Sequence, residues 1–265
     1  MFEFLKDNIA FIKDLSTILF AGTATIVAVL TYQRAKSTIL QPIRSEAIRK
    51  QSELLTNFLA DLKENNNSIE NWLNYVSLVE LNVVHALADF GFVFSQNEII
   101  KTKILKNTSS WIPCGSSNQL MGVEIVPTFS DELTPKESTD IRKQRYETLK
   151  SGKVEIDKIY LTKETQSVLN TLSNFSNDPF MPKSVSEDIN ILLKDININL
   201  TEILKTELES FLLSFAESYF KNNEAPKFDP VGVYNSFNHS RRHHRMLVDR
   251  VRDNIRKTLL IDEPW

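Results

Sequence analysis

The chain has 265 residues, of which 42% are hydrophobic and 25% are charged, and its formal net charge is −3. This slightly acidic balance excludes nucleic-acid binding through bulk charge. Its six glycines form neither of the glycine-rich loops, G-x-G-x-x-G and G-x-x-x-x-G-K-[ST], that hold phosphate groups. The length suits one membrane anchor with one or two domains, and the composition favours helices. We therefore expect a mainly α fold.

The first segment, 1–14, places apolar residues at helical spacing, with Phe2, Leu5, Ile9 and Ile12 on one stripe. This pattern predicts a short amphipathic segment at the outer membrane surface. The alternative is that these residues form the start of the helix that follows.

The next stretch, Leu15 to Gln33, contains no charged residue. A helix of this length is about as long as the ~30 Å hydrocarbon core of a bilayer is thick. We expect a transmembrane helix over 15–41, which Pro42 then ends or kinks. The alternatives are a buried core helix and a signal peptide, but the residues before the stretch mix both charge signs, which is not typical of a signal peptide.

Cationic residues cluster after the apolar stretch, at Arg34, Lys36, Arg44, Arg49 and Lys50. By the positive-inside rule they predict a single-pass protein of the inner (cell) membrane, with its N-terminus outside and its C-terminal domain in the cytoplasm. They also lie where contact with anionic lipid of the inner leaflet is expected, so membrane lipid is a predicted partner. The single cysteine, Cys114, fits a reducing compartment.

Small residues recur on one face of the apolar helix, at Thr17, Ala21, Thr25 (or Ala24) and Ala28. Such a face allows close helix–helix approach, and threonine hydroxyls can bond across the contact. The pattern predicts self-association into a homo-oligomer. The alternative is that small residues are common in membrane helices without any such role.

The segment 42–95 is interpreted as the first part of a helical core. A helix over 43–63 is followed by a capping-box pattern at Asn67 and Glu70 and then by a helix over 68–90. His85 and Asp89 are four residues apart on the second helix. They could form an acid–base couple, but a core histidine satisfied by a neighbour is the favoured interpretation.

The segment 96–161 is interpreted as a mixed insertion lobe. Strands are expected over 99–105, 122–126 and 154–161, with turn-rich sequence over 107–117 and 127–134. A surface helix over 134–150 begins at Thr134 and Pro135.

The segment 162–265 is interpreted as the second part of the helical core. A helix over 163–175 is followed by a helix of about thirty residues that begins at Ser184. Pro226 and Pro230 bound a linker, and a last helix is expected over 234–260.

This last helix contains the most distinctive sequence, HSRRHHR, and six arginines between Arg241 and Arg256. One helical face would be apolar and another would carry arginines. Four interpretations compete: binding of phosphate in nucleic acid or a nucleotide, binding of anionic lipid, pairing with an acidic protein surface, and a solvated face. The candidate phosphate- or partner-binding residues are Arg241, Arg242, Arg245, Arg252, Arg256, His243 and His244.

Catalytic and metal-binding patterns are weak. His239 and His243 are four residues apart, but H-E-x-x-H and G-x-S-x-G are absent. No histidine follows an arginine at the four-to-six-residue spacing of HEPN-type ribonucleases. We therefore expect no metal and no cofactor, assign no catalytic residue and lean against an enzyme. A nuclease-like enzyme that uses His243, His244 and nearby arginines is the third alternative.

The arrangement of anchor and domain resembles, in layout only, small single-pass bacterial membrane proteins that act as effectors or tethers in phage-defence and stress systems. The expected function is a membrane-anchored, self-associating effector or scaffold. Its cytoplasmic helical bundle, with its small β-containing or irregular insertion, senses a partner, and perturbation of the membrane on assembly is one form of this function. The alternative is a membrane-tethered protein that binds phosphate or nucleic acid through its arginine-rich C-terminal helix.

Overall fold

The structure is a computed structural model, and it describes residues 9–66, 68–92, 105–114, 135–222 and 228–260. The chain is mainly helical with a small two-stranded sheet. It divides into two compact units, Met1–Glu53 and Leu54–Trp265.

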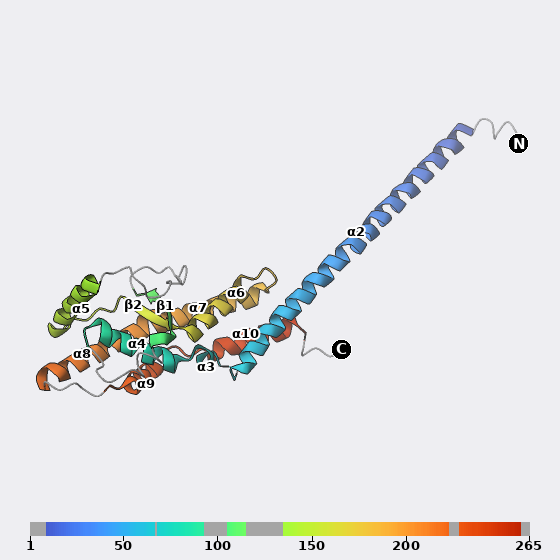
Figure 1. The fold of residues 1–265 in the computed structure, drawn as a ribbon. Coiled ribbons are helices and arrows are strands. Elements are labelled where there is room, and N and C mark those ends of the chain that lie inside the picture. Colours follow the sequence, from blue (N-terminus) through green and yellow to red (C-terminus); the bar gives the residue numbers. More distant parts are fainter. Residues whose placement is uncertain (1–8, 67, 93–104, 115–134, 223–227, 261–265) are drawn as a thin grey trace. The chain divides into compact units, whose positions relative to one another are not determined.

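The first long element, α2 (Ile9–Glu64), is one helix that continues through Pro42 (Figure 1). The prediction that Pro42 ends the helix at residue 41 is therefore wrong. Proline has a φ close to the helical value and removes one internal hydrogen bond, and a helix of 56 residues retains many others. Residues 1–8 lie outside the described residues, and Ile9 to Asp14 belong to α2, as the alternative interpretation of segment 1–14 expected.

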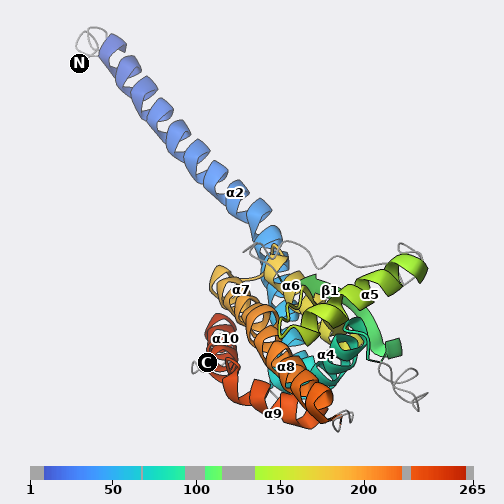
Figure 2. The ribbon, with the colours of Figure 1, turned by 90° about the vertical axis from the view of Figure 1, so that its left-hand side faces the viewer.

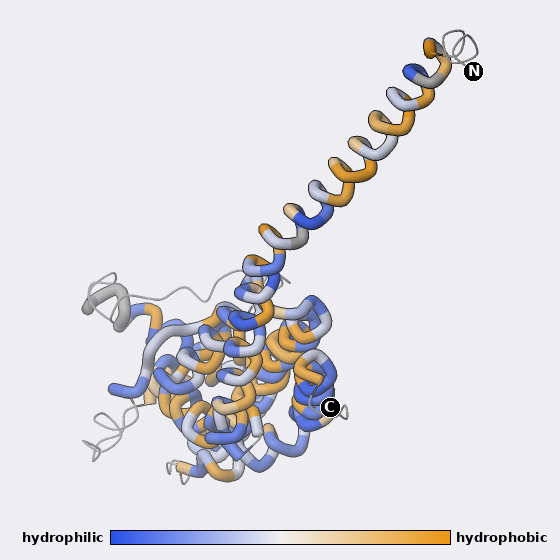
Figure 3. Tube along the Cα trace, turned by 90° about the vertical axis from the view of Figure 1, so that its right-hand side faces the viewer, coloured by the Kyte–Doolittle hydropathy of each residue, from blue (hydrophilic) through white to orange (hydrophobic). Residues whose placement is uncertain are grey.

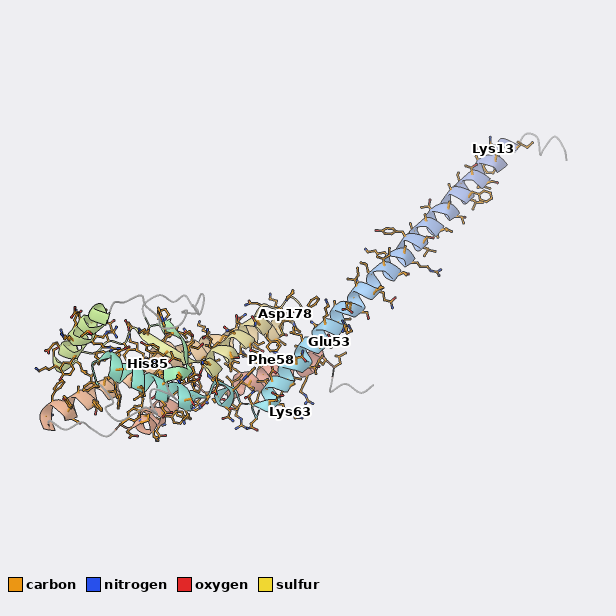
Figure 4. All side chains as sticks on the ribbon, viewed as in Figure 1. Lys13, Glu53, Phe58, Lys63, His85 and Asp178 are labelled. Atoms are coloured by element: carbon orange, nitrogen blue, oxygen red, sulfur yellow. The ribbon has the colours of Figure 1, made fainter. Side chains whose placement is uncertain are left out.

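The part of α2 in the first unit is exposed. Its side chains extend from the helix between Lys13 and Glu53 (Figure 4), and its N-terminal half is strongly apolar (Figure 3). Among the described residues, one helix is long and apolar enough to cross a membrane, and none of its most apolar window is buried.

The second unit contains the core. Its central helix, α4 (Tyr75–Asp89), is buried along most of its length. The last turns of α2 also enter this core, where the Phe58 ring contacts the Phe175 ring edge-on at 4.9 Å. The largest fully buried side chains are Leu55, Phe58, Leu62, Ile69, Leu73, Leu78, Leu81, Leu87, Leu149, Ile159, Leu161 and Phe237.

The helix predicted over 68–90 is interrupted. Asn74 has a left-handed backbone conformation with φ 51°, which separates α3 (Ile69–Leu73) from α4. Asparagine tolerates this conformation, and its side-chain oxygen caps α4 by accepting a hydrogen bond from the Ser77 N–H. Ser68 caps α3, whereas the predicted cap Asn67 lies outside the described residues.

The sheet pairs β1 (Thr108–Pro113) with β2 (Lys158–Thr162) in antiparallel orientation. Strand β2 confirms the second half of the strand predicted over 154–161, whereas residues 154–157 are not in a strand. Strand β1 falls in sequence that we interpreted as turn-rich. The strands predicted over 99–105 and 122–126 lie almost wholly outside the described residues. The short η2 (Leu105–Asn107) precedes β1, and α5 (Pro135–Lys150) is found as predicted.

Helix α6 (Lys163–Asn177) packs against α7 (Lys183–Ile198). The π-helical segment η3 (Asn199–Leu204) follows α7 and leads directly into α8 (Lys205–Asn222). Helix α7, η3 and α8 therefore form one rod (Figure 2). Ser184 does not cap this rod, because α7 already begins at Lys183 after Pro182.

The predicted last helix is two helices, α9 (Pro230–Ser240) and α10 (Arg245–Thr258). The prediction of one continuous helix over 234–260 is therefore wrong. The interruption falls within the HSRRHHR sequence. The residues that hydrogen-bond to this non-helical segment form the candidate site.

Candidate functional site

Residues Arg241 to His244, which we name the α9–α10 connection, join the last two helices. Arg241 is extended, with φ −68° and ψ 156°, and His244 occupies the position before the first residue of α10. Side chains from three other elements contact this connection: Glu70 of α3, Tyr75 of α4 and Asn199 of η3.

Asn199 holds the backbone of the connection. Its side-chain oxygen accepts a hydrogen bond from the Arg242 N–H at 2.8 Å, and its amide nitrogen donates to the Arg242 carbonyl at 2.9 Å. Asn199 is the first residue of the π-helical segment and is fully buried. The π-helical segment therefore places the Asn199 side chain where it satisfies both backbone hydrogen-bonding groups of Arg242, which is not helical.

Glu70 satisfies two donors of the connection. It accepts a hydrogen bond from the His244 N–H at 3.0 Å and lies 3.3 Å from the Arg241 guanidinium. Burial acts to raise the pKa of Glu70, but the N–H groups of His244 and Glu70 itself, together with the Ser68 hydroxyl, outweigh burial and hold this pKa at about 2. Glu70 is therefore ionised at neutral pH, and its negative charge lies at the N-terminus of α10, where the helix dipole favours it.

The Arg241 side chain is 8% exposed and lies over the Tyr75 ring, 5.3 Å from its centroid. This cation–π contact and the Glu70 ion pair together account for a guanidinium held away from water. Arg241 also donates a hydrogen bond to the Asn238 side chain at 2.9 Å.

His244 is fully buried. Its Nε2 lies 2.9 Å from the Tyr75 hydroxyl and 3.2 Å from the Asn199 amide nitrogen, and its buried Nδ1 has no hydrogen-bond partner among the described residues. Burial lowers the pKa of His244 to about 4, although the Glu70 charge acts in the opposite direction. The imidazole is therefore neutral at neutral pH.

The other arginine candidates are placed differently. Arg242 is 51% exposed and pairs with Asp195 at 2.8 Å, and Arg252 pairs with Asp249 at 2.7 Å on α10 itself. Arg245, Arg256 and His243 are exposed. The structure thus brings Arg241, Arg242 and His244 together at the connection and places Arg252 and Arg256 along α10.

The sequence interpretation missed the residues that hold the connection. Glu70, Tyr75 and Asn199 lie far from HSRRHHR in sequence, and nothing in their local patterns indicates that they meet it. Arg250 was also missed: it pairs with the buried Asp188 at 2.7 Å.

A second polar cluster surrounds His85. This histidine is buried, lies 2.9 Å from the Thr108 hydroxyl and stacks on the Tyr160 ring at 3.7 Å between centroids (Figure 4 shows His85 on α4). The prediction of a core histidine satisfied by a neighbour is confirmed. Burial, with a smaller effect of the Lys158 charge, lowers the pKa of His85 to about 4.

A small hollow lies between α4, α5 and β2, and its walls carry both charge signs. Arg145 donates to Asp157 at 2.8 Å and lies 3.6 Å from Asp89, which accepts a hydrogen bond from the Tyr160 hydroxyl at 3.0 Å. Lys158 lies over the Tyr160 ring. Because these charges compensate one another, the hollow has no strong preference for a ligand of either sign.

The predicted association face lies on the exposed surface of α2. The Thr17 hydroxyl donates to the Lys13 carbonyl and the Thr25 hydroxyl to the Ala21 carbonyl, both at 2.8 Å. Ala21 and Ala28 are exposed. The helix therefore satisfies its own hydroxyl donors at this face, without a second chain.

The predicted inner-leaflet residues, Arg34, Lys36, Arg44, Arg49 and Lys50, are all exposed on α2. Arg49 forms ion pairs with Glu46 and Glu53 on the same helix. Part of this positive charge is therefore compensated within the helix.

Within the described ranges, no group of three or more histidine, cysteine or acidic residues has a geometry that could hold a metal ion. Comparisons of the chain with protein-family models, with curated proteins and with solved structures found no match.

Proposed function

We propose that this protein is a single-pass membrane-anchored scaffold, which self-associates through its spanning helix and presents its helical second unit to a protein partner. The observation that carries the proposal is the uncharged stretch of α2 from Leu15 to Gln33. Its large apolar side chains are exposed, with Ile18 at 68% and Phe20 at 78%. A bilayer is the environment that would cover such a surface.

The energetics of the stretch support insertion. Its strongly apolar residues contribute roughly −2.5 to −5 kcal/mol in total. Three threonine hydroxyls, those of Thr17, Thr23 and Thr25, donate to carbonyls four residues earlier, at 2.8 Å each. These donors would therefore remain satisfied in lipid, where an unsatisfied donor is costly.

The orientation that we propose places the second unit in the cytoplasm and follows from the cations after the stretch. Arg34 and Lys36 are exposed on α2 immediately C-terminal to the uncharged residues, and Arg44 is exposed further along the same helix. They would lie at the inner leaflet of the cell membrane, where each can gain about 1 kcal/mol from anionic lipid.

The anchoring is tested by expressing the full chain and washing the membrane fraction with alkaline carbonate, which removes peripheral proteins. The wild type should remain in the pellet. Ile26→Lys places a charge in the middle of the stretch, at a cost of about 3 kcal/mol. This variant should shift toward the supernatant, whereas Ile39→Lys, outside the stretch, should not. Complete extraction of the wild type, or equal retention of the two variants, would contradict the proposal.

Self-association is tested with two matched variants. Thr25→Leu enlarges a residue on the face formed by Thr17, Ala21 and Ala28, whereas Thr23→Leu enlarges one on nearly the opposite side of the helix. Both threonines make the same kind of backbone hydrogen bond. Thr25→Leu should lower the mass of the full chain in detergent, and Thr23→Leu should leave it unchanged. A monomeric wild type would make the helix a plain tether.

An effector that perturbs membranes would be a scaffold of this kind whose assembly permeabilises the bilayer. Dye release from liposomes that contain the full chain, together with loss of release in Thr25→Leu, would support this sharper form of the proposal. Retention of the dye by the assembled wild type would remove it.

The ion pairs at the C-terminal arginines do not favour the phosphate-binding alternative. Arg241, Arg242 and Arg252 each contact a carboxylate, and Arg241 is almost fully buried. Fewer guanidinium groups are therefore available for phosphate than the sequence alone indicates, and the anchored scaffold is the function best supported.

A further inference from the structure

Helix α10 is held to the second unit by three sets of contacts. Its apolar stripe packs on α7 and buries Val248, Val251 and Ile255. On the same helix, Arg250 and Asn254 contact Asp188 of α7 at 2.7 Å and 2.6 Å. The N-terminus of α10 is held by the α9–α10 connection, which is fixed by Glu70, Tyr75 and Asn199. This third set includes the hydrogen bonds of a buried ionisable side chain, that of His244.

Titratable and charged groups face His244 from each neighbouring element. They are Glu70 of α3, Tyr75 of α4, Asp195 of α7, and Arg241 and His243 of the connection itself. Asn199 of η3 is the remaining polar contact and is uncharged. The two carboxylates favour a proton on His244, and burial, Arg241 and His243 oppose it.

The hydrogen bonds define which form of His244 fits the site. The Tyr75 hydroxyl lies 2.9 Å from Nε2, and its other contact is the Asn199 amide nitrogen, which is also a donor. For the Tyr75 hydroxyl proton, Nε2 is therefore the acceptor that the described contacts provide. The neutral imidazole with an unprotonated Nε2 satisfies this arrangement, and its proton is then on Nδ1.

A second proton would convert this acceptor into a donor. The Nε2–H of the imidazolium would face the Tyr75 hydroxyl and the Asn199 amide nitrogen, of which only the hydroxyl can accept a hydrogen bond. The Tyr75 proton would then lose its acceptor, and a charged ring would be buried with Nδ1–H still unpaired. Each of these changes is costly inside a protein.

We propose that the α9–α10 connection is a proton-sensitive latch: proton uptake at Nε2 of His244 removes the acceptor that Tyr75 and Asn199 share, and α10 separates while the rest of the second unit stays folded. Helix α10 is the last described element of the chain, so it can leave without unthreading any other described element. Separation would expose an amphipathic helix with arginines on its polar face. This inference does not depend on the anchoring of α2.

The test is hydrogen exchange of the full chain in detergent at pH 7.5 and pH 5.0, with rates corrected for the intrinsic effect of pH. With a pKa of about 4 in the closed state and about 6.5 in the open state, protons favour opening. Between pH 7.5 and pH 5.0, protection of the α10 amides should therefore fall about 30-fold more than it would if His244 did not titrate. At pH 5.0 the amides of α4 and α6 should remain more strongly protected than those of α10.

Two histidine variants separate the latch from general acid destabilisation. His244→Gln keeps an acceptor but cannot titrate in this range, so α10 should respond much less to pH. His85→Gln removes the other buried histidine, and α10 should respond as in the wild type. If α10 and α4 are equally protected at pH 5.0, so that they open in one step, or if His244→Gln responds as strongly as the wild type, the proposal is wrong.

A third variant keeps the test decisive should His244→Gln fail to fold. Tyr75→Phe preserves the ring but removes the hydroxyl that donates to Nε2, so the pKa of His244 in the closed state should rise toward its open-state value. The loss of α10 protection between pH 7.5 and pH 5.0 should therefore be smaller than in the wild type. An equal or larger loss in this variant would contradict the latch.

Discussion

At the scale of single residues, one carboxylate serves two helices. Glu70 lies in the first turn of α3, and it also accepts the N–H of His244 at the start of α10. Helix α10 has no side-chain cap of its own and begins with Arg245, whose positive charge is unfavourable at a helix N-terminus. A residue distant in sequence thus supplies the negative charge that the local sequence lacks.

Replacing Glu70 by glutamine should be strongly destabilising. Glu70→Gln leaves the almost buried Arg241 without its negatively charged partner, and we expect a loss of about 3 kcal/mol in the free energy of unfolding. Urea unfolding of the full chain in detergent measures this change. Glu187→Gln is the matched control, because Glu187 pairs with Lys183 on the surface and should cost less than about 0.5 kcal/mol. Similar losses for the two variants would show that burial of the Glu70–Arg241 pair has no energetic role.

The buried His85 predicts a loss of stability in acid. Its pKa in the folded protein is about 4, below the unfolded value of 6.5, so its contribution is complete above about pH 6.5 and is lost as the pH falls toward 4. Between pH 7.5 and pH 5.0, the wild type should lose about 2 kcal/mol more than His85→Gln. Urea unfolding at the two pH values measures the difference, and parallel losses would show that His85 does not titrate in this range.

At the scale of elements, the π-helical segment η3 has a structural consequence. It interrupts the rod formed by α7 and α8 at the position where Asn199 reaches the backbone of Arg242. Segments of this kind occur often at functional sites, where they redirect a side chain. The pattern of buried leucines continues on both sides, at Leu192 and Leu208, so the apolar spacing gives little sign of the interruption.

Truncating Asn199 should destabilise the connection. Asn199→Ala leaves the Arg242 N–H and carbonyl without their partner, and we expect a cost of about 2–3 kcal/mol in the free energy of unfolding. Asn197→Ala is the control, because the side-chain oxygen of Asn197 has no partner among the described residues. The proteolytic susceptibility of the connection should increase in the first variant only. Equal susceptibility in both variants would contradict a clamp at Arg242.

Most helices of the second unit could be predicted from sequence, because their apolar stripes and first residues are local features. The errors occur where a single residue acts through long-range contacts. Asn74 interrupts a continuous apolar stripe, and Arg242 leaves the helical conformation because Asn199 binds its backbone. Strand β1 was missed because Ser109, Ser110 and Pro113 are typical of turns, and its pairing with β2 overrides that local preference.

At the scale of the whole molecule, the two units differ in how their side chains are covered. Among the described residues, the buried core lies at or after Leu55, whereas the described part of the first unit is an exposed helix. The sequence predicts this division well, because an uncharged stretch and an amphipathic pattern are both local. The candidate site could not be predicted in the same way, since its members come from α3, α4, η3 and the connection.

The second unit should therefore fold without the first. A fragment that begins at Arg44 keeps all of the core, and its free energy of unfolding should lie within about 1 kcal/mol of the full-length value. Urea unfolding monitored by circular dichroism provides the comparison. A fragment that is unfolded, or much less stable, would show that residues 1–43 contribute to the core.

The outer edge of the two-stranded sheet affects how readily copies of the chain could aggregate when they are close together. The Asn82 side chain accepts a hydrogen bond from the Tyr160 N–H at 2.7 Å and donates to its carbonyl at 2.8 Å, on the edge of β2 that faces away from β1. One amide side chain thus occupies the backbone groups that a foreign strand would otherwise bind. On a membrane surface, where many copies of a tethered chain would be concentrated, this occupied edge would act against aggregation by strand pairing.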